Sequence, residues 1–449
     1  MPFEPLFNSL LFKNRRTELI KNIQQAHPEK SQNGIIILFA GFEHEGTSFK
    51  QESSFFYLTG IQEPAAALAI DIESQKTTLY IPHFGNERDK WIANALNTHE
   101  KTAHAYGIEN IQYSGDPSKG YQAYALFERA HYRFLLDEIA QWIQQKRSLF
   151  TLAPDNAASY IEQRYTLQHI QTFIPTLKEH LIDISPLVAR MRRKKTNPEI
   201  ELLYKAINIT LEAHEMAARI TRPGKIEYEV QAALEYVFIS SGGSPAFPSI
   251  IASGKNSTIL HYQHNNKVIE KNDVVVVDIG ARYSYYCGDI TRTYPASGTF
   301  TKRQRELYDI VLQTQQYIAD IAKPGMWLSH ADHPEKSLNH LARAFLKENK
   351  YDQYFPHGIG HFLGIDVHDV GDYTQPLEVG DVITIEPGIY IPEEQLGIRI
   401  EDNYWIVPEG CICLSEELPK AAEDIELFMQ EPIEIQEDHE PGEDSSLFE

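Results

Sequence analysis

Five side chains of the metal-ligand type lie in the C-terminal half of the chain, and each stands inside or beside a short apolar run. They are Asp278, Asp289, His361, Glu386 and Glu401. A single acidic residue is most often a surface group. Carboxylates within runs such as DVVVVDIG and VITIEPGIY are expected to be buried, and buried carboxylates need partners. Because four carboxylates and one imidazole suit two divalent cations with positions open for water and substrate, the pattern predicts a fold built around a hydrolytic metal site.

The spacing of the carboxylates predicts two β-hairpins. A turn within the segment 280–288 would set Asp278 opposite Asp289, and a turn within IPEEQLG would set Glu386 opposite Glu401. Directly opposed side chains on antiparallel strands lie about 4.5–5.5 Å apart at Cβ, so each pair can reach one ion or ion pair. Four carboxylates this close repel one another unless cations or protons neutralise them. We therefore expect both hairpins to meet at one site.

Histidines gather in the same half of the chain. His357 and His361 are four residues apart in HGIGHFLG, but the glycines between and after them disfavour a helix and favour a strand or turn close to substrate. His361 is then the candidate ligand. His261, His357 and His368 are candidate imidazoles for binding substrate or supporting the ligands.

Length and hydrophobic patterning predict two domains. A chain of 449 residues exceeds what one hydrophobic core usually supports. Residues 1–183 alternate short apolar runs with helical stretches, which is typical of an α/β domain. Residues 184–197 read as a linker, 198–430 as an α+β catalytic domain, and 431–449 as an acidic, disordered tail. The expected strands include 33–41, 65–72 and 77–82, and the expected helices are 11–26, 88–96, 121–146, 198–220, 227–241, 301–322 and 338–348.

Charge and cysteine content narrow the function class. The net charge of −22 argues against binding to nucleic acid, which requires basic patches. The three cysteines show no framework spacing, as expected in a reducing cytoplasm. The N-terminal residues do not read as a signal peptide, and no run approaches the ~20 apolar residues of a membrane helix. We expect a soluble cytoplasmic protein without nucleic-acid or membrane partners.

Several ordered segments resemble one enzyme family. HYQHNNKVIEKNDVVVVDIGARYSYYCGDITRTYP, HGIGHFLGIDVHDVG, ITIEPGIYIP and GIRIEDN are together similar to the pita-bread metallopeptidases, and most of all to the Xaa-Pro aminopeptidases (aminopeptidase P). QESSFFYLTGIQEPAAALAI extends the resemblance into the N-terminal half. The resemblance implies a creatinase-like α/β domain followed by a pita-bread catalytic domain. It also implies a two-metal hydrolase, usually activated by Mn²⁺, that acts on peptides with proline in second position and forms a homodimer or homotetramer.

The same resemblance implies roles for individual residues. Asp278 and Asp289 would bind one metal, Asp289 and Glu401 would bridge both, and His361 with Glu386 would complete the other. The residues implied to contact substrate or to catalyse are Phe247, His261, His357, His368, Glu386 and Arg399, with Phe247 standing where relatives also have Tyr. The implied nucleophile is a metal-bridging hydroxide that attacks the carbonyl before proline. In this reading an imidazole polarises the carbonyl, Glu386 takes the proton of the water, and another imidazole helps to protonate the leaving nitrogen.

Three alternatives share the fold. An Xaa-Pro dipeptidase (prolidase) would use the same ligand set. It differs from an aminopeptidase P in cutting only the Xaa-Pro dipeptide and not an Xaa-Pro-Xaa tripeptide. A non-catalytic binding protein would have lost some of the metal-binding residues, whereas all five are present in this sequence. A creatinase-like amidinohydrolase would not need the carboxylate set.

Overall fold

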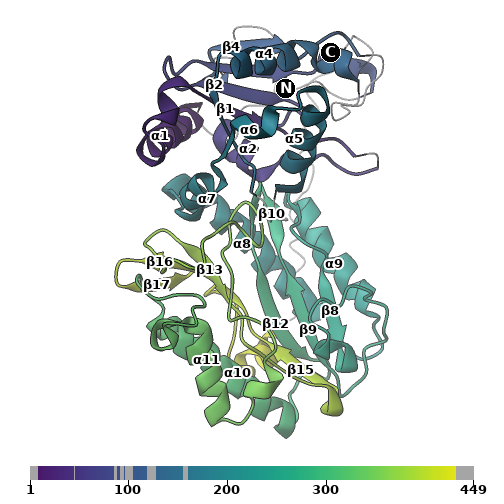
Figure 1. Ribbon diagram of the computed structural model, residues 1–449. Coiled ribbons are helices and arrows are strands. Elements are labelled where there is room, and N and C mark those ends of the chain that lie inside the picture. Colours follow the sequence, from purple (N-terminus) through teal and green to yellow (C-terminus); the bar gives the residue numbers. More distant parts are fainter. Residues whose placement is uncertain are drawn as a thin grey trace, which may run out of the picture. The chain divides into compact units, whose positions relative to one another are not determined.

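The computed structural model describes residues 9–44, 46–84, 88–91, 96, 105–118, 128–154 and 160–430 (Figure 1). They divide into two compact units, Met1–Lys194 with Val370–Asp372, and Lys195–Asp369 with Tyr373–Glu449. The predicted tail 431–449 lies outside the described residues, as do parts of the helices predicted over 88–96 and 121–146. No helix in the described ranges combines the length and apolar character that crossing a membrane requires.

Among the described residues, the N-terminal unit is built on a six-stranded mixed sheet. Its order is β4 (Asn110–Tyr113), β3 (Thr77–Ile81), β2 (Ala67–Asp71), β1 (Gly34–Phe39), β5 (Ser148–Thr151) and β6 (Leu181–Asp183). The helices described are α1 (Ser9–Ala26), α2 (Ser53–Thr59), α4 (Arg133–Gln144), α5 (Ile161–Phe173), α6 (Leu177–His180) and α7 (Ser185–Arg193). Strand β1 is the run GIIILF and is buried at every position, as expected of a central strand covered on both faces. The three predicted strands are β1, β2 and β3, and the stretch expected as a linker contains α7.

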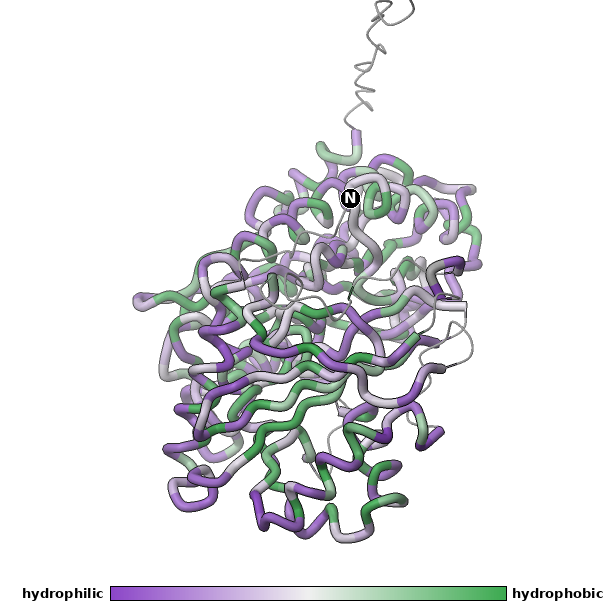
Figure 2. The backbone as a smooth tube through the Cα atoms, turned by 90° about the horizontal axis from the view of Figure 1, so that it is seen from above, coloured by the Kyte–Doolittle hydropathy of each residue, from purple (hydrophilic) through white to green (hydrophobic). Residues whose placement is uncertain are grey.

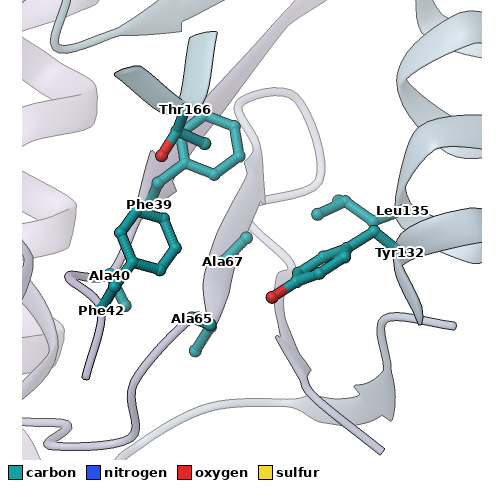
Figure 3. Close-up of a pocket in the computed structure, with 9 residues that line it drawn as sticks. Phe39, Ala40, Phe42, Ala65, Ala67, Tyr132, Leu135 and Thr166 are labelled. Atoms are coloured by element: carbon teal, nitrogen blue, oxygen red, sulfur yellow. The ribbon is translucent and has the colours of Figure 1, made fainter. Parts of the chain in front are cut away.

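A small apolar pocket lies against the sheet of this unit (Figure 3). It is lined by Phe39, Ala40, Phe42, Ala65, Ala66, Ala67, Tyr132, Leu135 and Thr166. The alanines leave space that larger side chains would fill. No carboxylate, histidine or cysteine lines it, so the pocket offers no set of metal ligands.

The C-terminal unit carries small antiparallel sheets between pairs of helices (Figure 1). The strands are β7 (Ser244–Pro245), β8 (Ile250–Ser253), β9 (Val274–Ile279), β10 (Ala281–Tyr283), β11 (Tyr286–Cys287), β12 (Ile290–Pro295), β13 (Val382–Ile385), β14 (Gly388–Ile391), β15 (Leu396–Arg399), β16 (Asp402–Val407) and β17 (Gly410–Cys413). The helices are α8 (Asn197–Ile220), α9 (Glu227–Ser240), α10 (Lys302–Ile321), α11 (Leu338–Glu348) and α12 (Ala422–Phe428). Figure 2 shows hydrophobic residues in continuous stretches along strands and alternating with hydrophilic ones along helices.

The predicted helices of this unit are confirmed to within a residue or two, because local signals set their ends. Helix α8 begins at a capping box, in which Glu199 accepts hydrogen bonds from the backbone and the hydroxyl of Thr196. Pro198 lies in the first turn, where its missing N–H costs nothing. The cap residue is Thr196, directly before the helix. Helix α10 begins in the same way, with Thr301 and Gln304.

The two hairpins differ in how well the sequence predicted their register. Strands β9 and β12 place Asp278 opposite Thr291, so the predicted pairing with Asp289 is wrong by two residues. The chain turns at Ser284 and Tyr285, which both have positive φ (48° and 78°), as a two-residue hairpin turn of type I′ requires. Neither residue is the glycine or asparagine that usually marks such a turn.

The second hairpin has the predicted register. Ile385 pairs with Asp402 and Gly388 with Arg399. Continuing that register across the break between β13 and β14 sets Glu386 opposite Glu401, as predicted.

Candidate metal centre

The five predicted ligands are positioned by the ends of strands in the C-terminal unit. Asp278 lies in β9, Asp289 directly precedes β12, Glu386 directly follows β13, and Glu401 stands between β15 and β16. His361 comes from the glycine-rich segment before β13. Asp289, His361 and Glu401 are buried, and one ligand atom of each lies within 4.8 Å of the others. Three segments distant in sequence therefore converge on one point.

The imidazole of His361 faces two of the carboxylates. Its Nε2 lies 3.3 Å from Asp289 Oδ2 and 3.6 Å from Glu386 Oε1. Its Nδ1 lies 3.0 Å from the carbonyl oxygen of Phe362, which fits a hydrogen bond donated by Nδ1–H. A backbone acceptor on one ring nitrogen leaves the other free to bind a metal, as in most histidine ligands.

Asp278 completes the group and has an oxygen without a hydrogen-bond partner. Its Oδ2 accepts a hydrogen bond of 2.7 Å from Nη2 of Arg399. Its Oδ1 is buried and has no hydrogen-bond partner among the described residues. Leaving such an acceptor unpaired costs about 1–3 kcal/mol, and more when it is charged. A cation bound at Oδ1 would remove that cost, so the donor set fits a metal site.

The electrostatics of the cluster also fit bound cations. Burial raises the pKa of Asp289 to about 6 and that of Glu386 to about 7, and neighbouring carboxylates add to both. Burial and the same neighbours raise the pKa of Glu401 well above its ordinary value. For His361, burial acts to lower the pKa, but Asp289 and Glu386 outweigh it and raise the pKa to about 9. Positive charge at the centre of the cluster would stabilise all four carboxylates in their ionised form.

A hydroxyl that sequence reasoning missed joins Arg399 to His357. The Oη of Tyr390 accepts a hydrogen bond of 2.8 Å from Nη1 of Arg399 and lies 2.9 Å from Nε2 of His357. His357 Nδ1 lies 2.8 Å from the carbonyl oxygen of Gly358, so Nδ1–H can donate there while Nε2 accepts from Tyr390. Burial and the charge of Arg399 lower the pKa of His357 to about 3, which keeps the ring neutral. Through Arg399, this chain of contacts ends at Asp278.

Two buried threonines were missed as well. Thr291 donates a hydrogen bond of 2.7 Å to Glu401 Oε2 and accepts one of 3.2 Å from Nε of Arg399. Thr384 accepts a hydrogen bond from the backbone N–H of His361 and lies 3.3 Å from Glu386 Oε1. Each threonine is two positions from a predicted ligand. Because alternate residues of a strand share a face, that spacing was the available signal.

The remaining predicted residues lie around the cluster. The ring of His368 stacks on His361, with centroids 4.0 Å apart, and burial lowers the pKa of His368 to about 4. His261 is exposed, and its charge acts on the pKa of both His357 and His368, so it lies near both. Phe247 packs against the backbone of Gly280, two residues beyond Asp278; a Cβ added to Gly280 would lie 2.8 Å from Phe247 Cε1. The structure thus gathers the predicted residues, whose individual roles stay predictions.

Comparison with known families covers both units. Residues 201–408 match metallopeptidase family M24, and residues 12–125 match the aminopeptidase P N-terminal domain. The Xaa-Pro aminopeptidase of Haemophilus influenzae is 31% identical to this chain over 454 residues, covering 93% of this chain and 96% of the relative. An Xaa-Pro dipeptidase from Homo sapiens is 28% identical over 487 residues and covers 93% of each chain.

Solved structures give the same result. The chain is similar to an aminopeptidase P structure from Bacillus anthracis, with a TM-score of 0.80, 31% identity, and coverage of 94% of this chain and 98% of the other. It is also similar to zinc-substituted Escherichia coli aminopeptidase P in complex with product, with a TM-score of 0.76, 27% identity and the same coverage. The predicted fold class and the predicted family are both confirmed. The chain therefore belongs to metallopeptidase family M24, with a pita-bread catalytic domain preceded by an N-terminal domain of the aminopeptidase P type.

Proposed function

We propose that this metallopeptidase is an Xaa-Pro aminopeptidase, which releases the N-terminal residue of peptides that have proline in second position. The observation that carries the proposal is the buried convergence of Asp289, His361 and Glu401. Asp278 in β9 adds a buried oxygen that has no hydrogen-bond partner among the described residues. Similarity to Xaa-Pro aminopeptidases over nearly the whole chain supports the substrate class.

Two divalent cations, most simply Mn²⁺, would be held by five residues. These are Asp278, Asp289, His361, Glu386 and Glu401. An oxygen-rich set of this kind favours a hard cation. When bound, such cations lower the pKa of a coordinated water and polarise the substrate carbonyl.

The chain's own groups would position substrate and move protons. Glu386, whose pKa burial already raises, would accept the proton of the attacking water at a carboxylate oxygen. His261 is exposed and would donate a hydrogen bond to the carbonyl oxygen before proline. His357 or His368 would help to deliver a proton to the imino nitrogen of the leaving fragment, and Arg399 would hold substrate and Asp278 in place.

Selection for proline would follow from its shape and from its missing N–H. A site that hydrogen-bonds an amide N–H at this position fails on proline, whereas an apolar surface that accepts the ring does not. Phe247, packed on Gly280 beside the cluster, would supply that surface. A Phe in place of Tyr leaves this contact purely apolar.

Cellular and quaternary assignments extend the same proposal. We infer a cytoplasmic enzyme, supported by three cysteines that form no disulfide. The similarity to aminopeptidase P supports a homodimer or homotetramer, to which the domain at residues 1–183 would contribute. The catalytic domain would span 198–430, after a connecting stretch at 184–197 and before an acidic tail at 431–449.

Peptide hydrolysis tests the proposal. We expect an Xaa-Pro-Xaa tripeptide to be cut by the protein with Mn²⁺ and not after chelation. Cleavage of an Xaa-Pro dipeptide alone would move the assignment to a dipeptidase, a candidate that similarity to the human Xaa-Pro dipeptidase keeps open. No cleavage of either peptide would favour a binding protein.

Ligand variants separate chemistry from folding. Asp289→Ala and Glu401→Ala should abolish turnover while the circular dichroism spectrum is retained. Glu393→Ala, an exposed carboxylate in the turn between β14 and β15, is the control and should remain active. Retained turnover in both ligand variants would contradict the bridging assignment.

A further inference from the structure

A second buried carboxylate, outside the metal cluster, has an unusually complete set of hydrogen bonds. Glu227 is the first residue of α9 and has no exposed surface. Its Oε1 accepts from the backbone N–H of Ser253 (2.8 Å), the hydroxyl of Ser253 (2.7 Å) and Nδ2 of Asn256 (3.1 Å). Its Oε2 accepts from the hydroxyl of Tyr262 (2.8 Å) and the backbone N–H of Lys267 (2.9 Å). Five donors therefore satisfy the two carboxylate oxygens of a side chain that is fully buried.

These donors lie in one continuous segment, which begins at Ser253, the last residue of β8, and continues through the loop that connects β8 to β9. The partners of Oε1 precede His261 in sequence, and the partners of Oε2 follow it. Tyr262, which donates to Oε2, is the next residue after His261. A single carboxylate therefore ties together both arms of the loop, residues 253–267, with His261 between them.

The position of His261 depends on that backbone. Its side chain is exposed, so packing around the ring does not fix it. The loop has further anchors that do not involve the side chain of Glu227. Asn265 donates from Nδ2 to the carbonyl oxygen of Ser249 and accepts from the backbone N–H of Ile251, and the hydroxyl of Ser257 accepts from the backbone N–H of Gly397 in β15.

We propose that Glu227 is a positioning residue of the peptidase reaction, because it holds both arms of the 253–267 loop and so fixes the imidazole of His261 at the substrate carbonyl. The inference rests on the proposed function. It assigns Glu227 no contact with substrate or metal. A carboxylate is needed at this position because only a group with two acceptor oxygens can serve donors on both sides.

Glu227→Gln tests this with little change in shape. The amide keeps one acceptor oxygen and replaces the other by an NH₂ group. With its oxygen toward Ser253 and Asn256, its NH₂ faces the N–H of Lys267, so the side-chain hydrogen bond to the arm that follows His261 is lost. The backbone N–H of residue 227 still donates to the carbonyl oxygen of Lys267, so that arm is loosened and not detached. Misplacement of a catalytic group by about 1 Å can cost about 100-fold in rate. We expect kcat for an Xaa-Pro-Xaa peptide to fall roughly 10- to 100-fold with a smaller change in KM.

Glu229→Gln is the matched control. Glu229 lies in the same first turn of α9, where it accepts from the backbone N–H of Ile226 and pairs with Lys225. Among the described residues it makes no hydrogen bond to the 253–267 loop, so the substitution makes the same chemical change at the same helix end. We expect kcat to change less than twofold. An equal loss in both variants would assign the effect to the helix and overturn the proposal.

A double-mutant cycle distinguishes positioning from general damage. If Glu227 acts through His261, then Glu227→Gln should cost little further activity in a His261→Ala background. Additive losses would overturn the proposal. Hydrogen exchange provides a readout independent of activity: peptides covering 253–267 should exchange faster in Glu227→Gln and not in Glu229→Gln, and unchanged exchange would overturn it. If the unaltered protein cleaves neither peptide, the proposed function fails, and the positioning role fails with it even if the exchange result holds.

Discussion

Replacing Thr291 by valine should weaken metal binding with little change in shape. The hydroxyl of Thr291 is buried and donates to Glu401 Oε2 at 2.7 Å while accepting from Nε of Arg399. A hydrogen bond to a charged group contributes about 1.5–3 kcal/mol. Removing it frees the Glu401 carboxylate to rotate and leaves a guanidinium N–H without its acceptor.

The magnitude follows from how such contacts tune metal sites. Loss of a hydrogen bond that orients a ligand typically costs 10–100-fold in metal affinity or activity, which corresponds to about 1.4–2.8 kcal/mol. We therefore expect the Mn²⁺ concentration for half-maximal activation of Thr291→Val to rise by about that factor. The free energy of unfolding without metal should fall by about 1–3 kcal/mol.

Thr293→Val is a closely matched control. Thr293 lies two positions along β12, is equally buried, and also makes two hydrogen bonds, but its partners are the backbone N–H and carbonyl of Arg399. We expect a similar loss of stability in urea denaturation and no comparable loss of Mn²⁺ affinity in calorimetric titration. Equal losses of affinity in the two variants, or unaltered affinity in Thr291→Val, would refute the argument.

Three further predictions follow from buried groups. Burial raises the pKa of Glu401 well above its ordinary value, so the metal-free folded state keeps a proton that the unfolded state releases above about pH 4.3. The stability of the metal-free protein therefore falls as pH rises. Glu401→Gln should raise the metal-free melting temperature at pH 8 and not at pH 4, and equal gains at both pH values would contradict this. Asp402→Ala should lower the free energy of unfolding by about 3–5 kcal/mol, since it removes the carboxylate partner of the fully buried Arg292. Replacing the exposed Glu423 by Ala should change it by less than about 1 kcal/mol. Tyr390→Phe removes the hydrogen bonds of a buried hydroxyl to Arg399, which is buried, and to His357, which is half-buried. It should lower kcat/KM roughly tenfold or more; unchanged kinetics would contradict its role.

Local signals explain why several elements were predictable. The ends of α8 and α10 are set by Thr196 with Glu199 and by Thr301 with Gln304, pairs only three residues apart. The run at β1 is apolar along its whole length and is buried on both faces. Such features depend on neighbouring residues, so they are visible without tertiary information.

Register was less predictable, because it depends on the turn. The hairpin of β9 and β12 turns at Ser284 and Tyr285, two residues with no intrinsic preference for positive φ. With the turn at these residues, Asp278 pairs with Thr291 and not with Asp289. The register of the second hairpin was predicted correctly because its turn lies midway between Glu386 and Glu401, at Pro392–Glu394.

The sequence by itself determined which residue types stand in apolar runs, and thereby the candidate ligands and the family. Only the tertiary structure decided their partners. The Thr291 hydroxyl on Glu401, the Tyr390 hydroxyl between Arg399 and His357, and the unpaired Asp278 oxygen are examples. Glu227 is the clearest case, since nothing around it in sequence distinguishes it from an ordinary helix-start acid until the fold brings the 253–267 loop onto it. The physical reason is that ligand identity is a local property, whereas hydrogen bonds between strands and loops far apart in sequence are set by how whole sheets and helices pack.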